Sequence, residues 1–166
     1  PINDGKTQKY HSEAGSSSKI FFNAIYQFFI KREVKEIKTL IITEGEFKTT
    51  KAGLHGIPAV GISGIHNSVK TTKSINQKTD KSETTNSEFL DELKSFIKKY
   101  NVKTIILLHD NDVKDNVGRP YRAAQFYSSV RNVKMACDNE RVQFIYKYIN
   151  ENIPYKGLDD LLIASK

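Results

Sequence analysis

The chain has 166 residues and a formal charge of +7, with a sequence pI of about 9.4. This length suits one domain with a substantial core, and a hydrophobic content of 38% lies within the globular range. The basic excess favours a polyanionic partner such as nucleic acid or a nucleotide. The single cysteine, Cys137, excludes an intrachain disulfide and a cysteine-rich zinc site, is expected to be inert, and indicates a reducing cytoplasm.

No apolar run approaches the roughly 20 residues that a membrane-spanning helix needs. The nearest candidate, 20–30, is short and is interrupted by Asn23 and Gln27. The polar start of the chain lacks the basic, apolar and small-residue regions of a signal peptide. We therefore expect a cytoplasmic protein that does not contact a membrane. The first residue is proline rather than methionine, which indicates a piece of a longer protein or a processed terminus.

The first half of the chain predicts a helix and two strands around a short helix. Polar residues 1–18 lead into a helix at about 19–32, where large apolar side chains recur at helical spacing. The apolar run from Thr39 to Thr43 predicts a buried strand. A short helix over 46–54 and a second strand over 58–62 are expected to follow.

The stretch 66–87 is rich in lysine, threonine, serine and asparagine, so it predicts a long exposed loop. Beyond it, helices are predicted at 87–100, 119–135 and 158–164, and strands at 103–108 and 142–146. This alternation predicts an α/β fold, a Rossmann-like parallel sheet of about four strands flanked by helices, with an N-terminal helical extension. We divide the chain into a lead-in segment and helix over 1–37 and a domain over 38–166, with a flexible insertion around 66–87.

Two of the predicted strands end at carboxylates. The run Leu40-Ile41-Ile42-Thr43 is followed by Glu44 and a glycine, and Ile105-Ile106-Leu107-Leu108 is followed by a histidine and then by Asp110 and Asp112. The carboxyl ends of parallel strands lie along one edge of a sheet, where ligands bind. The glutamate and the two aspartates could therefore share one site.

The spacing of Asp110 and Asp112 fits metal chemistry, because residues i and i+2 of an extended segment point the same way, roughly 6.6 Å apart. A few oxygen ligands suit Mg²⁺, or Mn²⁺ in its place, and Glu44 would then be free for proton transfer. Each motif alone also fits a simpler interpretation, an Asx-type turn after one strand and a helix start after the other. Both motifs together favour a metal-dependent phosphoryl-transfer site.

These motifs resemble the Toprim domain that DnaG-type primases, topoisomerases and some nucleases share. The resemblance consists of a strand ending in Glu44-Gly45 before a helix, the second strand at 56–61, and Asp110-x-Asp112 after a third.

Flanking segments extend the resemblance. Lys9-Tyr10-His11-Ser12 is similar to a stretch that precedes Toprim in primases, and 154–160 is similar to a segment that follows it. Glu44 to Lys48 and Gly61 to Asn67 are most similar to Toprim-like domains in replication proteins of plasmids, phages and integrative elements.

The resemblance implies a Toprim-type catalytic domain of a primase-like DNA replication protein, performing Mg²⁺-dependent nucleotidyl transfer on a DNA template. Asp110 and Asp112 would hold the metal, and Glu44 would act as general acid or base. The implied partners are single-stranded or primed DNA, nucleoside triphosphates, and a helicase or other replication domain. A metal-dependent nuclease and a non-catalytic module that binds nucleic acid or protein remain alternatives. The last is supported by Lys48, which stands where primases usually carry an acid.

Several further residues are candidates for contacts with phosphate. Lys48 could equally face a phosphate or be solvated, whereas Lys51 is expected to be solvated. Arg119 and Arg122 lie at the start of a predicted helix, whose amide groups favour anions, although Arg122 could equally be a surface residue. The resemblance also implies an auxiliary acid near the metal at Asp159, for which a purely electrostatic role at a helix N-terminus is the alternative. No histidine is assigned a metal role.

Overall fold

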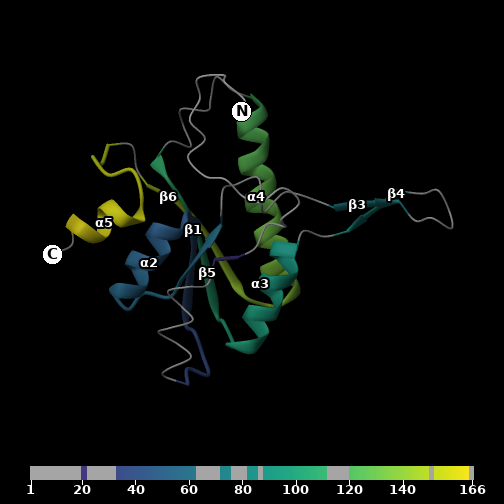
Figure 1. Cartoon of the computed structure of the whole chain (residues 1–166), viewed down its shortest axis with the longest axis horizontal. Coiled ribbons are helices and arrows are strands. Elements are labelled where there is room, and N and C mark those ends of the chain that lie inside the picture. Colours follow the sequence, from purple (N-terminus) through teal and green to yellow (C-terminus); the bar gives the residue numbers. More distant parts are fainter. Residues whose placement is uncertain are drawn as a thin grey trace, which may run out of the picture.

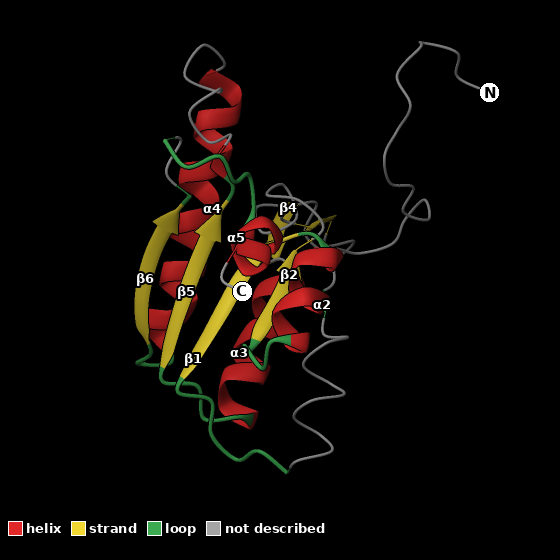
Figure 2. Cartoon of the chain, turned by 90° about the vertical axis from the view of Figure 1, so that its left-hand side faces the viewer, coloured by secondary structure: helices red, strands yellow, loops and turns green. Residues whose placement is uncertain are grey.

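A computed structural model describes residues 20–21, 33–62, 72–75, 82–85, 88–111, 120–149 and 152–164. Its main sheet has four strands, all parallel, in the order β2-β1-β5-β6. The strands are β1 (Thr39–Glu44), β2 (Ala59–Ile62), β5 (Thr104–His109) and β6 (Gln143–Tyr148). Figure 2 shows them side by side, with their arrows pointing the same way. The predicted parallel sheet of about four strands is confirmed.

Helices cover both faces of this sheet. They are α2 (Glu46–Leu54), α3 (Glu88–Lys99), α4 (Pro120–Asn139) and α5 (Leu158–Ala164). Helix α2 contacts α5 on one face, and α3 contacts α4 on the other (Figure 1). The arrangement is Rossmann-like, as the alternation of strands and helices predicts. Within the part of the chain that the structure describes, none of the helices has the length and apolar character needed to cross a bilayer.

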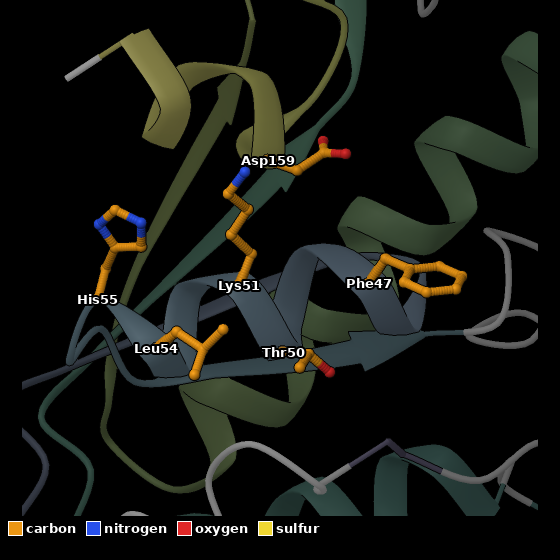
Figure 3. Close-up of a pocket in the computed structure, with 6 residues that line it drawn as sticks. All are labelled: Phe47, Thr50, Lys51, Leu54, His55 and Asp159. Atoms are coloured by element: carbon orange, nitrogen blue, oxygen red, sulfur yellow. The ribbon is translucent and has the colours of Figure 1, made fainter. Parts of the chain in front are cut away.

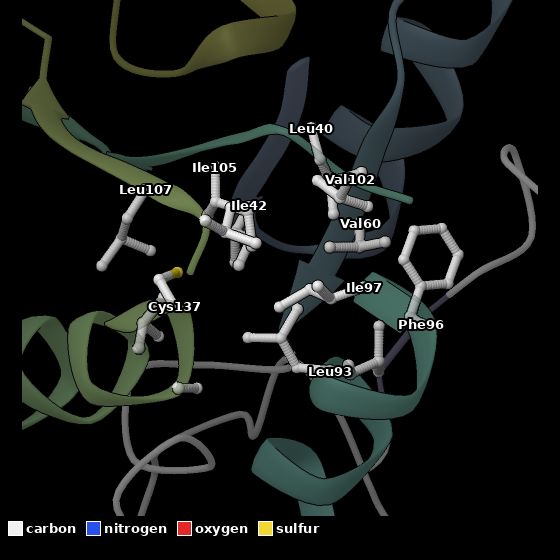
Figure 4. Close-up of a cluster of buried hydrophobic side chains, with 14 of the residues drawn as sticks. Leu40, Ile42, Val60, Leu93, Phe96, Ile97, Val102, Ile105, Leu107 and Cys137 are labelled. Atoms are coloured by element: carbon white, nitrogen blue, oxygen red, sulfur yellow. The ribbon is translucent and has the colours of Figure 1, made fainter. Parts of the chain in front are cut away.

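The core has two parts because the sheet is covered on both faces. The larger cluster packs Leu40 and Ile42 of β1 and Ile105 and Leu107 of β5 against α3 and α4 (Figure 4). The smaller cluster includes Leu158 of α5 with neighbours from α2 and β2. A strand that is buried on both faces has a nearly continuous apolar sequence. This explains why the strand interiors were recognisable in the sequence.

Cys137 lies in the larger cluster, on α4 (Figure 4). Burial is the main cause that raises the pKa of its thiol to about 12, and the charge of Asp138 contributes in the same direction. The thiol therefore stays protonated at neutral pH and acts as a small apolar side chain in the core.

The stretch predicted as one exposed loop at 66–87 contains two short strands, which corrects that prediction. Strands β3 (Thr72–Ile75) and β4 (Ser82–Thr85) pair antiparallel and lie apart from the main sheet (Figure 1). The polar composition of 66–87 predicted a loop, but the two strands contain threonines. Their β-branched side chains favour extended backbone even in a polar segment.

The helix predicted at about 19–32 lies outside the described residues except at Ile20 and Phe21, and at these two positions the helix is wrong. Phe21 forms an antiparallel bridge with Gly61, with N–H to carbonyl distances of 2.9 and 3.1 Å. The backbone N–H of Ile20 donates to Glu92 at 2.8 Å. Because β2 is an edge strand, its outer backbone groups need partners, and Phe21 supplies those of Gly61.

The order of connections places a switch point between β1 and β5. From β1 the chain passes through α2 to β2 on one side, and from β5 it passes through α4 to β6 on the other side. In open α/β sheets, ligands bind outside the carboxyl ends of the strands at such a point.

Candidate active site

A hollow of about 340 Å³ lies at the carboxyl ends of β1 and β5. It is lined by Glu44, Gly45, Phe47, Lys48, Asp110, Lys156, Gly157, Asp159 and Asp160. These residues come from the end of β1, the start of α2, the end of β5, the segment that leads into α5, and the first turn of α5. Four of the residues predicted from the sequence, Glu44, Lys48, Asp110 and Asp159, are therefore brought together.

The sheet register brings Glu44 and Asp110 to the same edge. Thr43 of β1 pairs with Leu108 of β5, so both strands end at the same level. Gly45 then turns the chain into α2 with a φ of 89°, a conformation that glycine adopts without steric cost, and its N–H donates to the carbonyl of Ile62 at 3.0 Å. The turn into α2 is thereby tied to the end of β2.

An ion pair joins Lys48 of α2 to Asp110. Lys48 Nζ donates to Asp110 Oδ2, and the two side chains are only 16% and 9% exposed. Leu108, two residues before Asp110, packs with the α2 and α5 cluster, so strand alternation turns the aspartate toward α2 as well. The sequence left Lys48 either facing a phosphate or solvated, and in the structure its partner is a carboxylate.

Gly157 leaves the space that Lys48 occupies. A Cβ atom at this position would lie 2.5 Å from Lys48 Cε and 2.6 Å from Asp159 Oδ1. Any larger residue would have to displace both side chains. The absence of a side chain at Gly157 therefore lets the lysine reach Asp110 beneath the start of α5.

Asn111 ties the segment before α5 to the end of β5. Its backbone N–H donates to the carbonyl of Lys156 at 3.0 Å, and its side-chain Nδ2 donates to the carbonyl of Tyr155 at 3.1 Å. Two hydrogen bonds from one residue fix both the position and the direction of this segment. Asn111 therefore holds one wall of the hollow against the strand that carries Asp110.

Asp160 has a structural role at the start of α5. Its Oδ2 accepts hydrogen bonds from the backbone N–H of Lys156 at 2.9 Å and of Gly157 at 3.3 Å. This is the reach-back of an acid in the first helical turn to the N–H groups before the helix. These two bonds are the largest causes that lower the pKa of Asp160, and the charges of Lys48 and Lys51 lower it further.

We expect the turn before α5 to loosen at acidic pH. Because the folded-state pKa of Asp160 is depressed, its contribution to stability is present above the ordinary value of 3.8 and is lost as the pH falls through the lower folded-state value. The amide resonances of Lys156 and Gly157 in an NMR pH titration should therefore move with a midpoint below 3.8. Asp160→Asn should remove that transition, and a midpoint at or above the ordinary value would contradict the capping role.

His109 belongs to the core rather than to the hollow. Its ring is fully buried, lies 5.1 Å from the ring of Phe126 and 5.4 Å from that of Tyr146, and its Nδ1 is 3.3 Å from the Tyr146 hydroxyl. Burial is the main cause that raises the pKa of Tyr146. His109 therefore packs in the core next to two aromatic rings.

Three predicted site residues cannot be placed at side-chain level. Asp112 and Arg119 lie outside the described residues, and Arg122 lies in the first turn of α4, where only the backbone is described. Conversely, the sequence interpretation did not assign Phe47 or Lys156 to the site. Their positions in the sequence could have indicated the site, because Phe47 lies in the helix after Glu44 and Lys156 lies in the segment before Asp159.

A protein-family model described as "Domain of unknown function (DUF3854)" matches residues 29–166. The chain belongs to the DUF3854 family. No curated protein and no solved structure matches the chain. The DUF3854 match includes every residue that lines the hollow, so the candidate site is contained within the family domain.

The lining of the DUF3854 hollow contains four carboxylates and two lysines, a formal charge of −2. An excess of oxygen ligands of this kind suits a hard divalent cation such as Mg²⁺, so the residues present fit the ion that the sequence predicted. Among the described residues, no three or more histidine, cysteine, aspartate and glutamate side chains are grouped so as to hold a metal. The second predicted ligand, Asp112, lies outside those residues.

Proposed function

We propose that the chain is the Toprim-type catalytic domain of a primase-like DNA replication protein, which performs Mg²⁺-dependent nucleotidyl transfer on a DNA template in the cytoplasm. One observation carries this proposal. Glu44 and Asp110, at the carboxyl ends of two adjacent parallel strands, line one hollow beside the switch point of the sheet. Ligand sites in open α/β sheets form at this position, and paired acids there support phosphoryl-transfer chemistry.

Asp110 and Asp112 are the residues that would hold the cation. When bound, Mg²⁺ would supply positive charge that orients a triphosphate and offsets the charge developing on the transferred phosphoryl group. Asp110 contributes one carboxylate to the lining of the hollow, and the backbone beside it is held by Asn111, which is anchored to the segment before α5. The lysines at 48 and 156 line the same hollow and can contact phosphate oxygens.

Glu44 is the residue proposed to move the proton. It lines the hollow with Asp110 but comes from the other strand, so it can accept a proton from an attacking hydroxyl without giving up a metal ligand. In nucleotidyl transfer this hydroxyl belongs to the growing strand, and in the nuclease alternative it belongs to water. The same carboxylate serves both reactions.

A non-catalytic module is the second candidate, and the ion pair between Lys48 and Asp110 favours it. The ammonium group supplies the aspartate with a charge partner that requires no metal. A chain that keeps the fold for binding alone could use this pair to stabilise the strand end. Metal binding distinguishes the two candidates.

Titration with Mg²⁺ or Mn²⁺ tests the proposal directly. Calorimetry or NMR should show binding to the native chain, and the double variant Asp110→Asn, Asp112→Asn should remove it while circular dichroism shows an intact fold. A matched control is Asp91→Asn, Asp138→Asn, which removes the same charge from exposed helix positions. Unchanged metal binding in the first variant would show that these aspartates are not the ligands.

A further inference from the structure

A second hollow, of about 630 Å³, lies along α2 beside the first. It is lined by Phe47, Thr50, Lys51, Leu54, His55 and Asp159 (Figure 3). Figure 3 shows Phe47 at one end of the helix, Leu54 and His55 at the other, and Lys51 pointing from α2 toward α5. Its volume lies within the usual range for sites that hold a small organic group, about 300–1,000 Å³.

The wall formed by α2 exposes two large apolar side chains. Phe47 and Leu54 are 76% and 83% exposed, although they lie two turns apart on one face of the helix. The opposite face buries Thr49 and Ala52 against the sheet. Lys51 separates the two apolar side chains, so a charged group lies between them. The centres of protein interfaces are depleted in charged residues, whereas a flat ring next to a charged group suits this surface.

The two hollows adjoin along α2. Phe47 and Asp159 line both of them, and only one helical turn separates Lys48, in the first hollow, from Lys51, in the second. A ligand whose phosphate lies beside Lys48 could therefore place its next unit against Phe47. A nucleic-acid strand, in which flat bases branch from a chain of sugars and phosphates, presents both kinds of group side by side.

We propose that the second hollow binds a base of single-stranded nucleic acid, with the Phe47 ring as the stacking surface and Lys51 as a partner for the adjacent phosphate. Aromatic rings that stack on bases and cations that follow the backbone are the recurring elements of such sites. The chain's charge of +7 agrees with this partner. The choice of nucleic acid as the ligand rests on the proposed function. The assignment of Phe47 as a stacking surface goes beyond that function, which does not require this residue.

Fluorescence anisotropy with a labelled single-stranded oligodeoxynucleotide of mixed sequence tests the proposal. Phe47→Ala should weaken binding by about 5- to 150-fold, the fold-change that corresponds to ~1–3 kcal/mol for one stacked base. Phe47→Trp should retain the affinity, whereas Phe47→Leu, which is apolar but not aromatic, should lose most of it. Tyr127→Ala is the matched control, since Tyr127 is 77% exposed on the distant α4 and should not affect binding.

An oligonucleotide of abasic sites separates stacking from charge. The native chain should bind it more weakly, and Phe47→Ala should then cause no further loss. Lys51→Ala should reduce the slope of the logarithm of affinity against the logarithm of salt concentration by about 0.7, the value for one phosphate on a single strand. Equal affinity of the native and Phe47→Ala chains for the intact strand would overturn the proposal, and so would an equal loss on both strands.

These measurements are made in EDTA, so they do not depend on metal loading or turnover. If metal binding fails but the Phe47 effect is present, the base site stands and the catalytic proposal falls. If metal binds at the aspartates and the Phe47 effect is absent, the catalytic proposal stands and the base site falls. If the chain does not bind the oligonucleotide at low salt, the inference is also overturned. That result would favour a protein ligand at this face.

Discussion

Replacing Glu44 with glutamine is expected to lower turnover by roughly 10²–10⁴-fold, the usual range for loss of general acid–base help. Glutamine keeps the size of the side chain but cannot accept the proton of an attacking hydroxyl. Metal affinity should stay close to that of the native protein, because the proposed ligands are Asp110 and Asp112 on the other strand. The measurements are nucleotide incorporation on a template and, separately, cleavage of a labelled strand alone, both on the full-length protein.

Glu46→Gln is the matched control for this variant. Glu46 lies two residues further on and is exposed in the first turn of α2. It does not line the hollow, so Glu46→Gln removes the same charge from outside the site. Its turnover should be nearly native. The two assays also separate primase from nuclease. Native turnover in the Glu44→Gln variant would remove Glu44 from the mechanism, and a native protein that binds metal but is inert in both assays would favour the non-catalytic module.

The two central strands, β1 and β5, were predictable because helices cover the sheet on both faces there. Leu40, Ile42, Ile105 and Leu107 belong to continuous apolar runs, and such runs alternating with helical patterns leave few topologies. The position of Glu44 and of the acid after β5 follows from the same rule, because parallel strands end at one edge. Local sequence and a general property of parallel sheets were sufficient for this much of the site.

The contacts that shape the hollow were not predictable in this way. Lys48 and Asp110 are 62 positions apart, and their pairing depends on the strand register and on space left by Gly157, which comes from a third segment. Likewise, Phe21 was predicted to be helical from its spacing with other apolar residues. The unpaired edge of β2 determines its conformation instead. Propensity and periodicity report on neighbours in sequence, whereas these contacts depend on tertiary placement.

Replacing Lys48 with methionine is expected to destabilise the fold by about 2–4 kcal/mol, a little less than the usual cost of breaking a fully buried ion pair because the hollow admits solvent. Methionine preserves most of the apolar stem, so the change removes mainly the ammonium from Asp110 Oδ2. Chemical denaturation monitored by circular dichroism measures the change in the free energy of unfolding. Lys51→Met is the control. It lies one turn further along α2 and makes no ion pair among the described residues, so it should change stability by less than about 0.5 kcal/mol.

A double-variant cycle assigns the loss to the pair itself. In an Asp110→Asn background, Lys48→Met should cost much less than it does alone, because the charge that the lysine balances is already absent. Equal costs in both backgrounds would show that Lys48 stabilises the fold by packing rather than by its charge.

The same variant reports on the metal. Lys48 occupies the cationic position beside Asp110, so removing it should raise Mg²⁺ affinity, on the order of tenfold or ~1.4 kcal/mol. A ligand that binds only the folded state stabilises it by about 2.7 kcal/mol at a hundred times its dissociation constant. Millimolar Mg²⁺ should therefore restore more stability to Lys48→Met than it adds to the native chain. If Mg²⁺ stabilises both chains equally, the ammonium and the metal do not compete, and the cation binds away from Asp110.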